Sequence, residues 1–194
     1  EDFESKVLPI LKEQTQNCSK CEIINLSPYD SKMEFDKSLL AEQLGEPAAQ
    51  VNFLIVHWNA KYHTELEPIV EAFKKLTSKE VVIIGAAGMA KPNEALIPLS
   101  KTVLAQVPDL VIIGEMEESE RLLNHGYFGP EMLTAIRPPK AYMGMGYSSL
   151  FFGSELANNW NKKKSDDWIS HFKSTKSKSR KLWPALNDFF KRGK

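Results

Sequence analysis

Three side chains able to bind a ligand or move a proton stand together directly after an apolar, strand-like run. They are His57, Trp58 and Asn59, and Asp30 stands in the corresponding place after an earlier apolar run. In open α/β sheets, ligands bind beyond the carboxyl ends of the strands. The four side chains are therefore predicted to converge on one rim, where His57 and Asp30 could act as an acid–base pair. The alternative interpretation is a structural histidine whose hydrogen bonds are satisfied within the protein.

A pair of serines, Ser148 and Ser149, follows Gly146 and Tyr147 and precedes a predicted helix over residues 150–160. A serine at a helix N-terminus can act as a nucleophile, because neighbouring N–H groups can stabilise an oxyanion. It can equally cap the helix, since serine is favoured at that position and accepts a hydrogen bond there. The residues alone leave both roles open.

Two further patterns are incomplete versions of cofactor or metal motifs. The run Gly85–Gly88 lacks the third glycine of a dinucleotide fingerprint and the Gly-Lys-Ser/Thr ending of a phosphate loop. Cys18 and Cys21 form the only cysteine pair, and a structural zinc would need two more ligands. The sequence therefore predicts no cofactor and no metal. The two cysteines are expected to form a local disulfide or to remain as thiols.

Apolar runs and helical periodicity alternate along the first 160 residues. Continuous apolar runs predict strands, and apolar residues at intervals of three and four predict helices. The predicted strands are Glu22–Leu26, Val51–Val56, Val81–Ile84 and Leu110–Ile113, and the predicted helices cover residues 3–17, 35–44, 65–76, 99–106 and 150–160. Because the strands lack a polar face, this alternation favours a mostly parallel sheet with helices on both sides, a three-layer α/β/α fold.

Charge divides the chain into two unequal parts. Residues 161–194 carry eleven Lys and Arg against three Asp, whereas the first 160 residues carry fourteen Lys and Arg against 22 Asp and Glu. We expect residues 1–160 to form the α/β domain and residues 161–194 to form a basic helical extension packed on it. A basic tail could also bind nucleic acid or anionic lipid. It lacks aromatic residues interleaved on a recognisable basic face, so no nucleic-acid partner is expected.

The longest apolar stretches are about strand length. A membrane helix needs roughly 20 apolar residues, so no membrane span is expected. No charged-then-apolar leader begins the sequence, and an export signal is therefore expected to be absent or already removed.

The order of motifs over residues 20–160 resembles that of the subtilisin-like serine proteases, the subtilases. Gln50–Val56 is similar to the strand of the family's "ADVINMSLG" pattern, and Val81–Gly88 is similar to the strand that ends in "AAGN". Asn124–Pro130 resembles the family's "S-N-x-G-P" turn, and Gly146–Ser149 falls where the nucleophile motif "GTS" would stand. The resemblance implies a subtilisin-like arrangement of the α/β fold.

The catalytic positions of the family are altered in this chain. Met89 stands where the family has its oxyanion asparagine, and methionine cannot donate a hydrogen bond there. The predicted helix 3–17 lacks the family's histidine, and no strand corresponds to the one that carries the family's aspartate. These departures predict a catalytically inactive domain that binds a peptide or protein partner in a remnant cleft, lined by Trp58, Asn59, Gly88, Met89 and Gly114.

The alternative is a serine hydrolase or peptidase with a non-standard catalytic constellation. In that reading Ser149 or Ser148 acts with His57 and Asp30. Because subtilases are commonly exported, the resemblance implies a periplasmic or extracellular location. The partner and the oligomeric state stay open.

Overall fold

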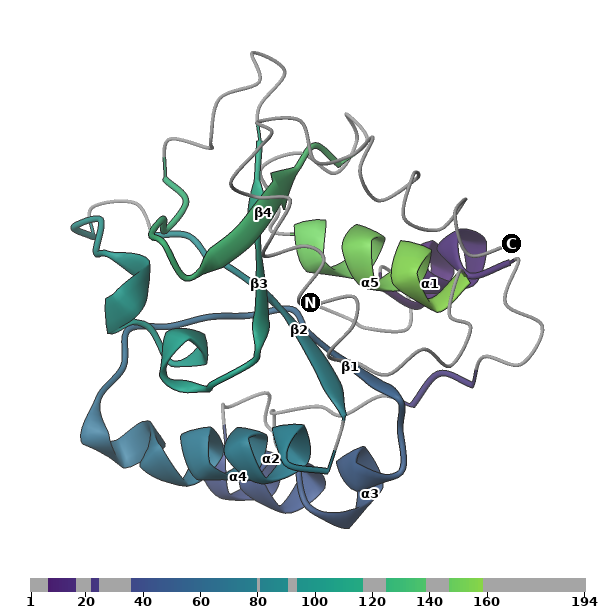
Figure 1. Cartoon of the computed structure of the whole chain (residues 1–194), viewed down its shortest axis with the longest axis horizontal. Coiled ribbons are helices and arrows are strands. Elements are labelled where there is room, and N and C mark those ends of the chain that lie inside the picture. Colours follow the sequence, from purple (N-terminus) through teal and green to yellow (C-terminus); the bar gives the residue numbers. More distant parts are fainter. Residues whose placement is uncertain are drawn as a thin grey trace.

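Four short strands form one parallel sheet among the residues that the structure describes, and their order follows the sequence (Figure 1). The computed structural model describes residues 7–16, 22–24, 36–79, 81–90, 94–116, 125–138 and 147–158. The strands are β1 (Phe53–Val56), β2 (Val82–Ala86), β3 (Val111–Glu115) and β4 (Met132–Ile136). Every neighbouring pair is parallel. All four carboxyl ends therefore lie at the same edge of the sheet.

The two central strands explain why the sequence shows continuous apolar runs. β2 and β3 are buried at all five of their residues, because helices cover both faces of the sheet. Strands of this kind need apolar side chains at every position rather than at every second one. The predicted strands at 51–56, 81–84 and 110–113 are confirmed, with the first beginning two residues later than predicted and the second and third one residue later.

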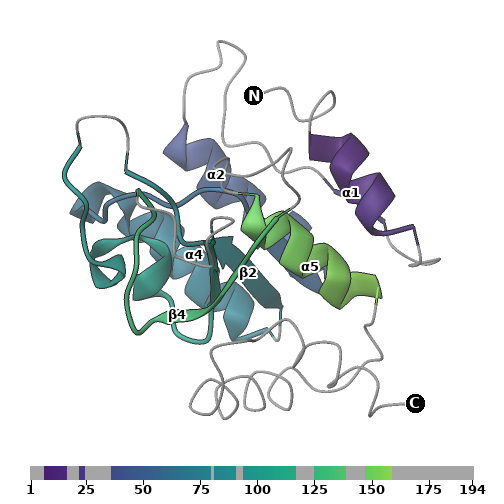
Figure 2. The ribbon, with the colours of Figure 1, turned by 90° about the horizontal axis from the view of Figure 1, so that it is seen from above.

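Two pairs of helices form the outer layers (Figure 2). On one face, α2 (Lys37–Gln43) and α4 (Glu67–Thr77) contribute to one buried apolar cluster. On the other face, α1 (Leu8–Gln14) and α5 (Ser148–Asn158) contribute to a second cluster. The structure thus has the predicted three-layer α/β/α architecture.

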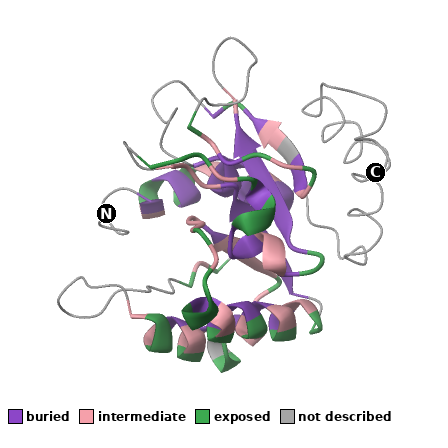
Figure 3. Ribbon diagram, turned by 90° about the vertical axis from the view of Figure 1, so that its left-hand side faces the viewer, coloured by how far each residue is buried: buried purple, intermediate pink, exposed green. Residues whose placement is uncertain are grey.

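Local sequence signals set the boundaries of the outer helices. The Asp36 side chain caps α2 by accepting hydrogen bonds from the N–H groups of Ser38 and Leu39, as expected for aspartate at an N-cap. The short helix α3 (Glu46–Ala49) follows directly. α4 is preceded by the 3-10 turn η2 (Thr64–Leu66) and buries one stripe of side chains. Its other side is exposed (Figure 3), which is the pattern of an amphipathic surface helix.

Four predicted elements need correction. The helix expected over residues 99–106 is two 3-10 turns, η3 (Leu99–Lys101) and η4 (Leu104–Gln106), because Thr102 between them is extended. Within the described residues the N-terminal helix ends at Gln14 rather than at residue 17, and its proline lies in the first turn, where proline is tolerated. The last helix begins two residues earlier than predicted. Of the predicted strand Glu22–Leu26, residues 22–24 belong to no strand, and residues 25 and 26 lie outside the described residues. β4 was not predicted, because its five residues show neither strict alternation nor a continuous apolar run.

Close packing of α5 on the sheet depends on a glycine in its middle. A Cβ atom at Gly153 would lie 2.7 Å from Cδ1 and 2.8 Å from Cγ1 of Ile55 in β1. Such distances are shorter than carbon atoms tolerate, so only glycine lets the helix approach β1 this closely. α5 begins at the edge of the sheet where the strands end.

No helix in the described parts of the chain is long and apolar enough to cross a membrane. The predicted basic extension at residues 161–194 lies outside the described residues. Asp30, Cys18 and Cys21 lie outside them as well.

Candidate functional site

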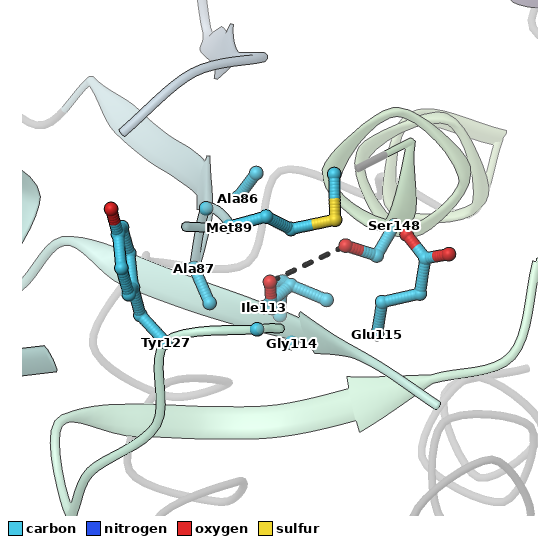
Figure 4. A pocket seen from close by; sticks show the side chains of 10 residues that line it. Ala86, Ala87, Met89, Ile113, Gly114, Glu115, Tyr127 and Ser148 are labelled. Carbon is cyan, nitrogen blue, oxygen red and sulfur yellow. Dashed lines mark hydrogen bonds between the residues drawn. The ribbon is translucent and has the colours of Figure 1, made fainter. Parts of the chain in front are cut away.

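A small pocket lies where the ends of β2 and β3 meet the start of α5 (Figure 4). Its volume is about 20 Å³, which is room for about one water molecule. The pocket is lined by the predicted site residues Gly88, Met89, Gly114 and Ser148, and also by Glu115 and Tyr127. The sheet therefore brings four of the predicted residues together, although the space between them is too small for a peptide side chain.

Both serines of the candidate nucleophile motif are buried. Ser148 and Ser149 are only 1% and 0% exposed. The Ser148 hydroxyl donates to the carbonyl of Ile113 and the Ser149 hydroxyl donates to the carbonyl of Val56, each at 3.4 Å, a long distance for a hydroxyl hydrogen bond. Both hydroxyl protons thus face the backbone of the sheet. Ser148 and Ser149 are the first two residues of α5, so both lie within the helix and not at the capping position that precedes it.

His57 lies beside the residue that precedes the two serines. Its ring stacks on Tyr147 with 4.6 Å between ring centroids and 26° between the planes. The structure therefore brings His57 next to the start of α5. Asp30 lies outside the described residues, so the predicted pairing of Asp30 with His57 stays a prediction.

The Asn59 side chain joins three segments of the chain. Its amide group donates to the carbonyl of Ala87 at 2.9 Å and to Oγ1 of Thr102 at 3.0 Å. Its oxygen accepts from the N–H groups of Ala60 at 3.0 Å and Leu104 at 3.2 Å. All the hydrogen-bonding positions of an amide group are thus occupied within the protein. Trp58, next to it, is half-buried and packs against the core cluster on the α4 side.

Gly88 and Met89 continue the chain beyond β2 along the pocket. Gly88 has a φ of +83°, in the left-handed region that favours glycine. Its carbonyl accepts the N–H of Tyr127 at 3.0 Å, and Met89 forms an antiparallel bridge with Gly126. The Met89 side chain extends toward Ser148 (Figure 4). An apolar side chain without a hydrogen-bond donor thus lies beside Ser148.

Two pocket residues were not predicted as site residues. Glu115 is the last residue of β3, and its side chain is directed toward Ser148 although the residue is only 8% exposed. Tyr127 is also buried, and burial followed by the charge of Glu94 raises the pKa of its phenol above the usual range. The strand-end rule that selects Gly114 also covers Glu115, so the sequence did contain a signal for the carboxylate. Nothing comparable marks Tyr127.

No cluster of three metal-ligating side chains of the types His, Cys, Asp and Glu occurs within the described residues.

Comparison with solved structures identifies the fold. A cold adapted subtilisin-like serine proteinase matches 81% of this chain and 61% of its own chain, with 12% identity and a TM-score of 0.64. The chain has a subtilisin-like fold. The serine protease MycP1, described as an essential component of the type VII (ESX-1) secretion system, matches 80% of this chain with 13% identity and a TM-score of 0.59. MycP1 with its N-terminal propeptide removed matches 70% with 14% identity and a TM-score of 0.56.

This similarity concerns the fold alone, because the identities are low. The subtilisin-like arrangement expected from the order of motifs is confirmed at that level. The chain spans 55–61% of the lengths of these three proteases. No protein-family model matches the chain, and no curated protein sequence matches it.

A third serine of α5 provides a stability test for the buried hydroxyls. Ser154 is 1% exposed, and its hydroxyl has no hydrogen-bond partner within the described part of the protein. A buried hydroxyl without a partner costs about 1–3 kcal/mol. We expect Ser154→Ala to raise the free energy of unfolding by about 1 kcal/mol in urea titrations. Ser149→Ala, which removes a hydroxyl that does donate, is the matched control and should not stabilise the protein.

Proposed function

We propose that this chain is a catalytically inactive domain of subtilisin-like fold that acts by binding a protein or peptide. The observation that carries the proposal is the state of Ser148 and Ser149. A nucleophile must reach its substrate and pass its proton to a base. Here both serines are buried and both hydroxyl protons are directed to backbone carbonyls.

The surroundings of the serines support the same proposal. Met89 lies beside Ser148, and its thioether has no proton to donate to an oxyanion. Loss of one such donor alone lowers turnover by about 10²–10³-fold in serine proteases. The pocket has room for about one water molecule, so a substrate side chain would have to displace protein atoms to enter.

A partner would contact the exposed parts of Trp58 and Met89, beyond the carboxyl ends of β1 and β2, rather than enter the pocket. Both residues are partly exposed, and aromatic residues and methionine are enriched in protein interfaces. Asn59, Gly88 and Gly114 are occupied by contacts within the chain, so their part is to hold the rim in shape. A periplasmic or extracellular location would fit a relative of exported proteases.

The alternative function is a serine hydrolase that uses His57 as its base. The stacking of His57 on Tyr147 favours it, because the ring lies next to the residue preceding the serines. For this alternative, the start of α5 would have to move so that a serine hydroxyl leaves its carbonyl partner and reaches the imidazole.

Labelling with a fluorophosphonate probe separates the two functions, because the probe reacts with activated serines. The wild type, Ser148→Ala and Ser149→Ala would be compared with a heat-denatured sample and with an active subtilisin. We expect no labelling of the wild type above the denatured sample. Labelling that disappears in one serine variant would contradict inactivity and identify the nucleophile.

A further inference from the structure

A larger hollow lies on the other face of the sheet from α5, between α2 and α4. The two helices pack side by side on that face (Figure 1). The hollow, called here the α2–α4 groove, has a volume of about 450 Å³. This volume lies within the range of about 300–1,000 Å³ that is typical of ligand pockets. Neither of the functions proposed above involves this space.

The walls of the α2–α4 groove are mostly apolar. The apolar lining comes from both helices and consists of Ala41, Leu44, Pro68, Ala72 and Leu76. Leu44 and Leu76 are buried at the bottom, whereas Ala41 and Ala72 are partly exposed. Because alanine side chains are short, these two positions leave open the space that larger residues would fill. The groove can therefore take up apolar side chains from another molecule.

Two positive charges stand beside this apolar lining. Lys75 and Lys79 line the groove and are exposed, and neither forms an ion pair within the described residues. Glu71 also lines the groove, but Lys74 binds it at 2.7 Å and the hydrogen bond lowers the pKa of its carboxyl. A lysine in the last turn of a helix is favourable to the helix dipole, which explains Lys75. Lys79 lies beyond the end of α4 at Thr77, where this explanation no longer applies.

The helical walls decide which kind of chain fits the groove. The backbone N–H and C=O groups of a helix bond to one another, so the walls offer no partners to the backbone of an extended peptide. A helical peptide satisfies its own backbone, and amphipathic helices bind apolar grooves through side chains three and four residues apart. Carboxylates beside the apolar stripe of such a helix would complement the two lysines.

We propose that the α2–α4 groove binds an amphipathic helix of a protein partner, with apolar side chains over Ala41 and Ala72 and acidic side chains against Lys75 and Lys79. This site is separate from the rim at Trp58 and Met89. Lys79 lies just before β2, which begins at Val82, and therefore at the opposite edge of the sheet. The inference goes beyond the proposed function and does not depend on the state of the serines.

The first test titrates the full chain with a synthetic peptide of about 18 residues, which exceeds the length at which isolated helices are marginal. The peptide carries leucine on one helical stripe and glutamate on both sides of the stripe. One matched peptide has lysine in place of glutamate, and another has alanine in place of leucine. We expect the acidic leucine peptide to bind at least about tenfold more tightly than either matched peptide in fluorescence anisotropy. Equal affinities, or no binding of the acidic peptide, would overturn the proposal.

The second test changes the groove itself. The double variant Lys75→Glu, Lys79→Glu should bind the acidic peptide about tenfold more weakly at low salt, because two attractions become repulsions. Lys101→Glu is the matched control, since Lys101 is an exposed lysine of η3 that does not line the groove. Ala72→Phe should weaken binding to a similar extent by filling the groove, and the lysine variants decide if it does not fold. Unchanged affinity in the double variant would contradict the proposal.

Two other occupants of the groove would give different results. An acidic segment of the same chain would exclude the peptide, and the double lysine variant would then lower the melting temperature. A second copy of the chain would appear as a dimer in sedimentation experiments, and the double variant would dissociate it. Either result would overturn the proposal. Fluorophosphonate labelling reports on the serines alone, so a labelled wild type would overturn the proposed inactivity and leave the groove to be judged by these tests.

Discussion

Replacement of Asn59 by leucine is expected to destabilise the protein by about 3 kcal/mol or more. The substitution removes four hydrogen bonds within the protein, and each such bond contributes about 0.5–1.5 kcal/mol net. Two of the groups left behind, the Ala87 carbonyl and the Leu104 N–H, belong to buried residues, and a buried polar group without a partner costs about 1–3 kcal/mol. The Thr102 hydroxyl still donates to the Leu99 carbonyl. Urea unfolding followed by circular dichroism measures the loss, which would be a large part of a typical domain stability of about 5–15 kcal/mol.

Asn52→Leu is the matched control for this prediction, because its side chain is exposed just before β1. It should change the free energy of unfolding by no more than about 0.5 kcal/mol. Asn59→Asp keeps the shape but loses both amide donors, and it places a carboxylate oxygen against the Ala87 carbonyl. We therefore expect it to destabilise as strongly as the leucine variant. A loss below about 1 kcal/mol in both Asn59 variants would show that the network does not hold the rim.

The layers of the fold were predictable because strands that are buried on both faces have apolar residues at every position. The runs at 81–84 and 110–113 are apolar at every position, which two-sided burial requires. The stripe of α4 follows the helical period for the same reason. β4 was missed because Thr134 and Ala135 interrupt its apolar residues, so that it shows neither strict alternation nor a continuous apolar run. The helix expected at 99–106 was wrong because the extended Thr102, which binds the Asn59 side chain, divides it into two 3-10 turns.

The candidate site was only partly predictable. The sequence predicts where each strand ends, but it does not predict which way the side chains beyond that end point. The position after β1 predicted only that His57 lies at the rim of the sheet, and not that its ring stacks on Tyr147. The same rule gave no indication that the Asn59 amide would be fully used by Ala60, Ala87, Thr102 and Leu104. Those partners lie up to 45 residues away along the chain. Contacts of such long range follow from the packing of loops and leave no local pattern.

A side chain at position 88 is expected to destabilise the protein strongly, because two features of the structure exclude it. The φ of Gly88, +83°, lies in the left-handed region, which costs about 1–2 kcal/mol for a residue with a Cβ atom. That atom would also lie 2.8 Å from Cβ of Asn59 and 3.2 Å from Cδ2 of Tyr127. We expect Gly88→Ala to destabilise by about 3 kcal/mol or more in urea unfolding, because strain and overlap add.

Comparison with Gly88→Asn separates the two causes. Asparagine adopts the left-handed region more readily than alanine, but its Cβ atom meets the same neighbours. If the contact with Asn59 dominates, both variants lose the same stability, and the loops after β1 and β2 cannot part to admit a side chain. If backbone strain dominates, asparagine recovers about 1 kcal/mol. Near-wild-type stability of both variants would mean that these loops separate easily, and the small volume of the Ser148 pocket would then no longer argue against a bound substrate.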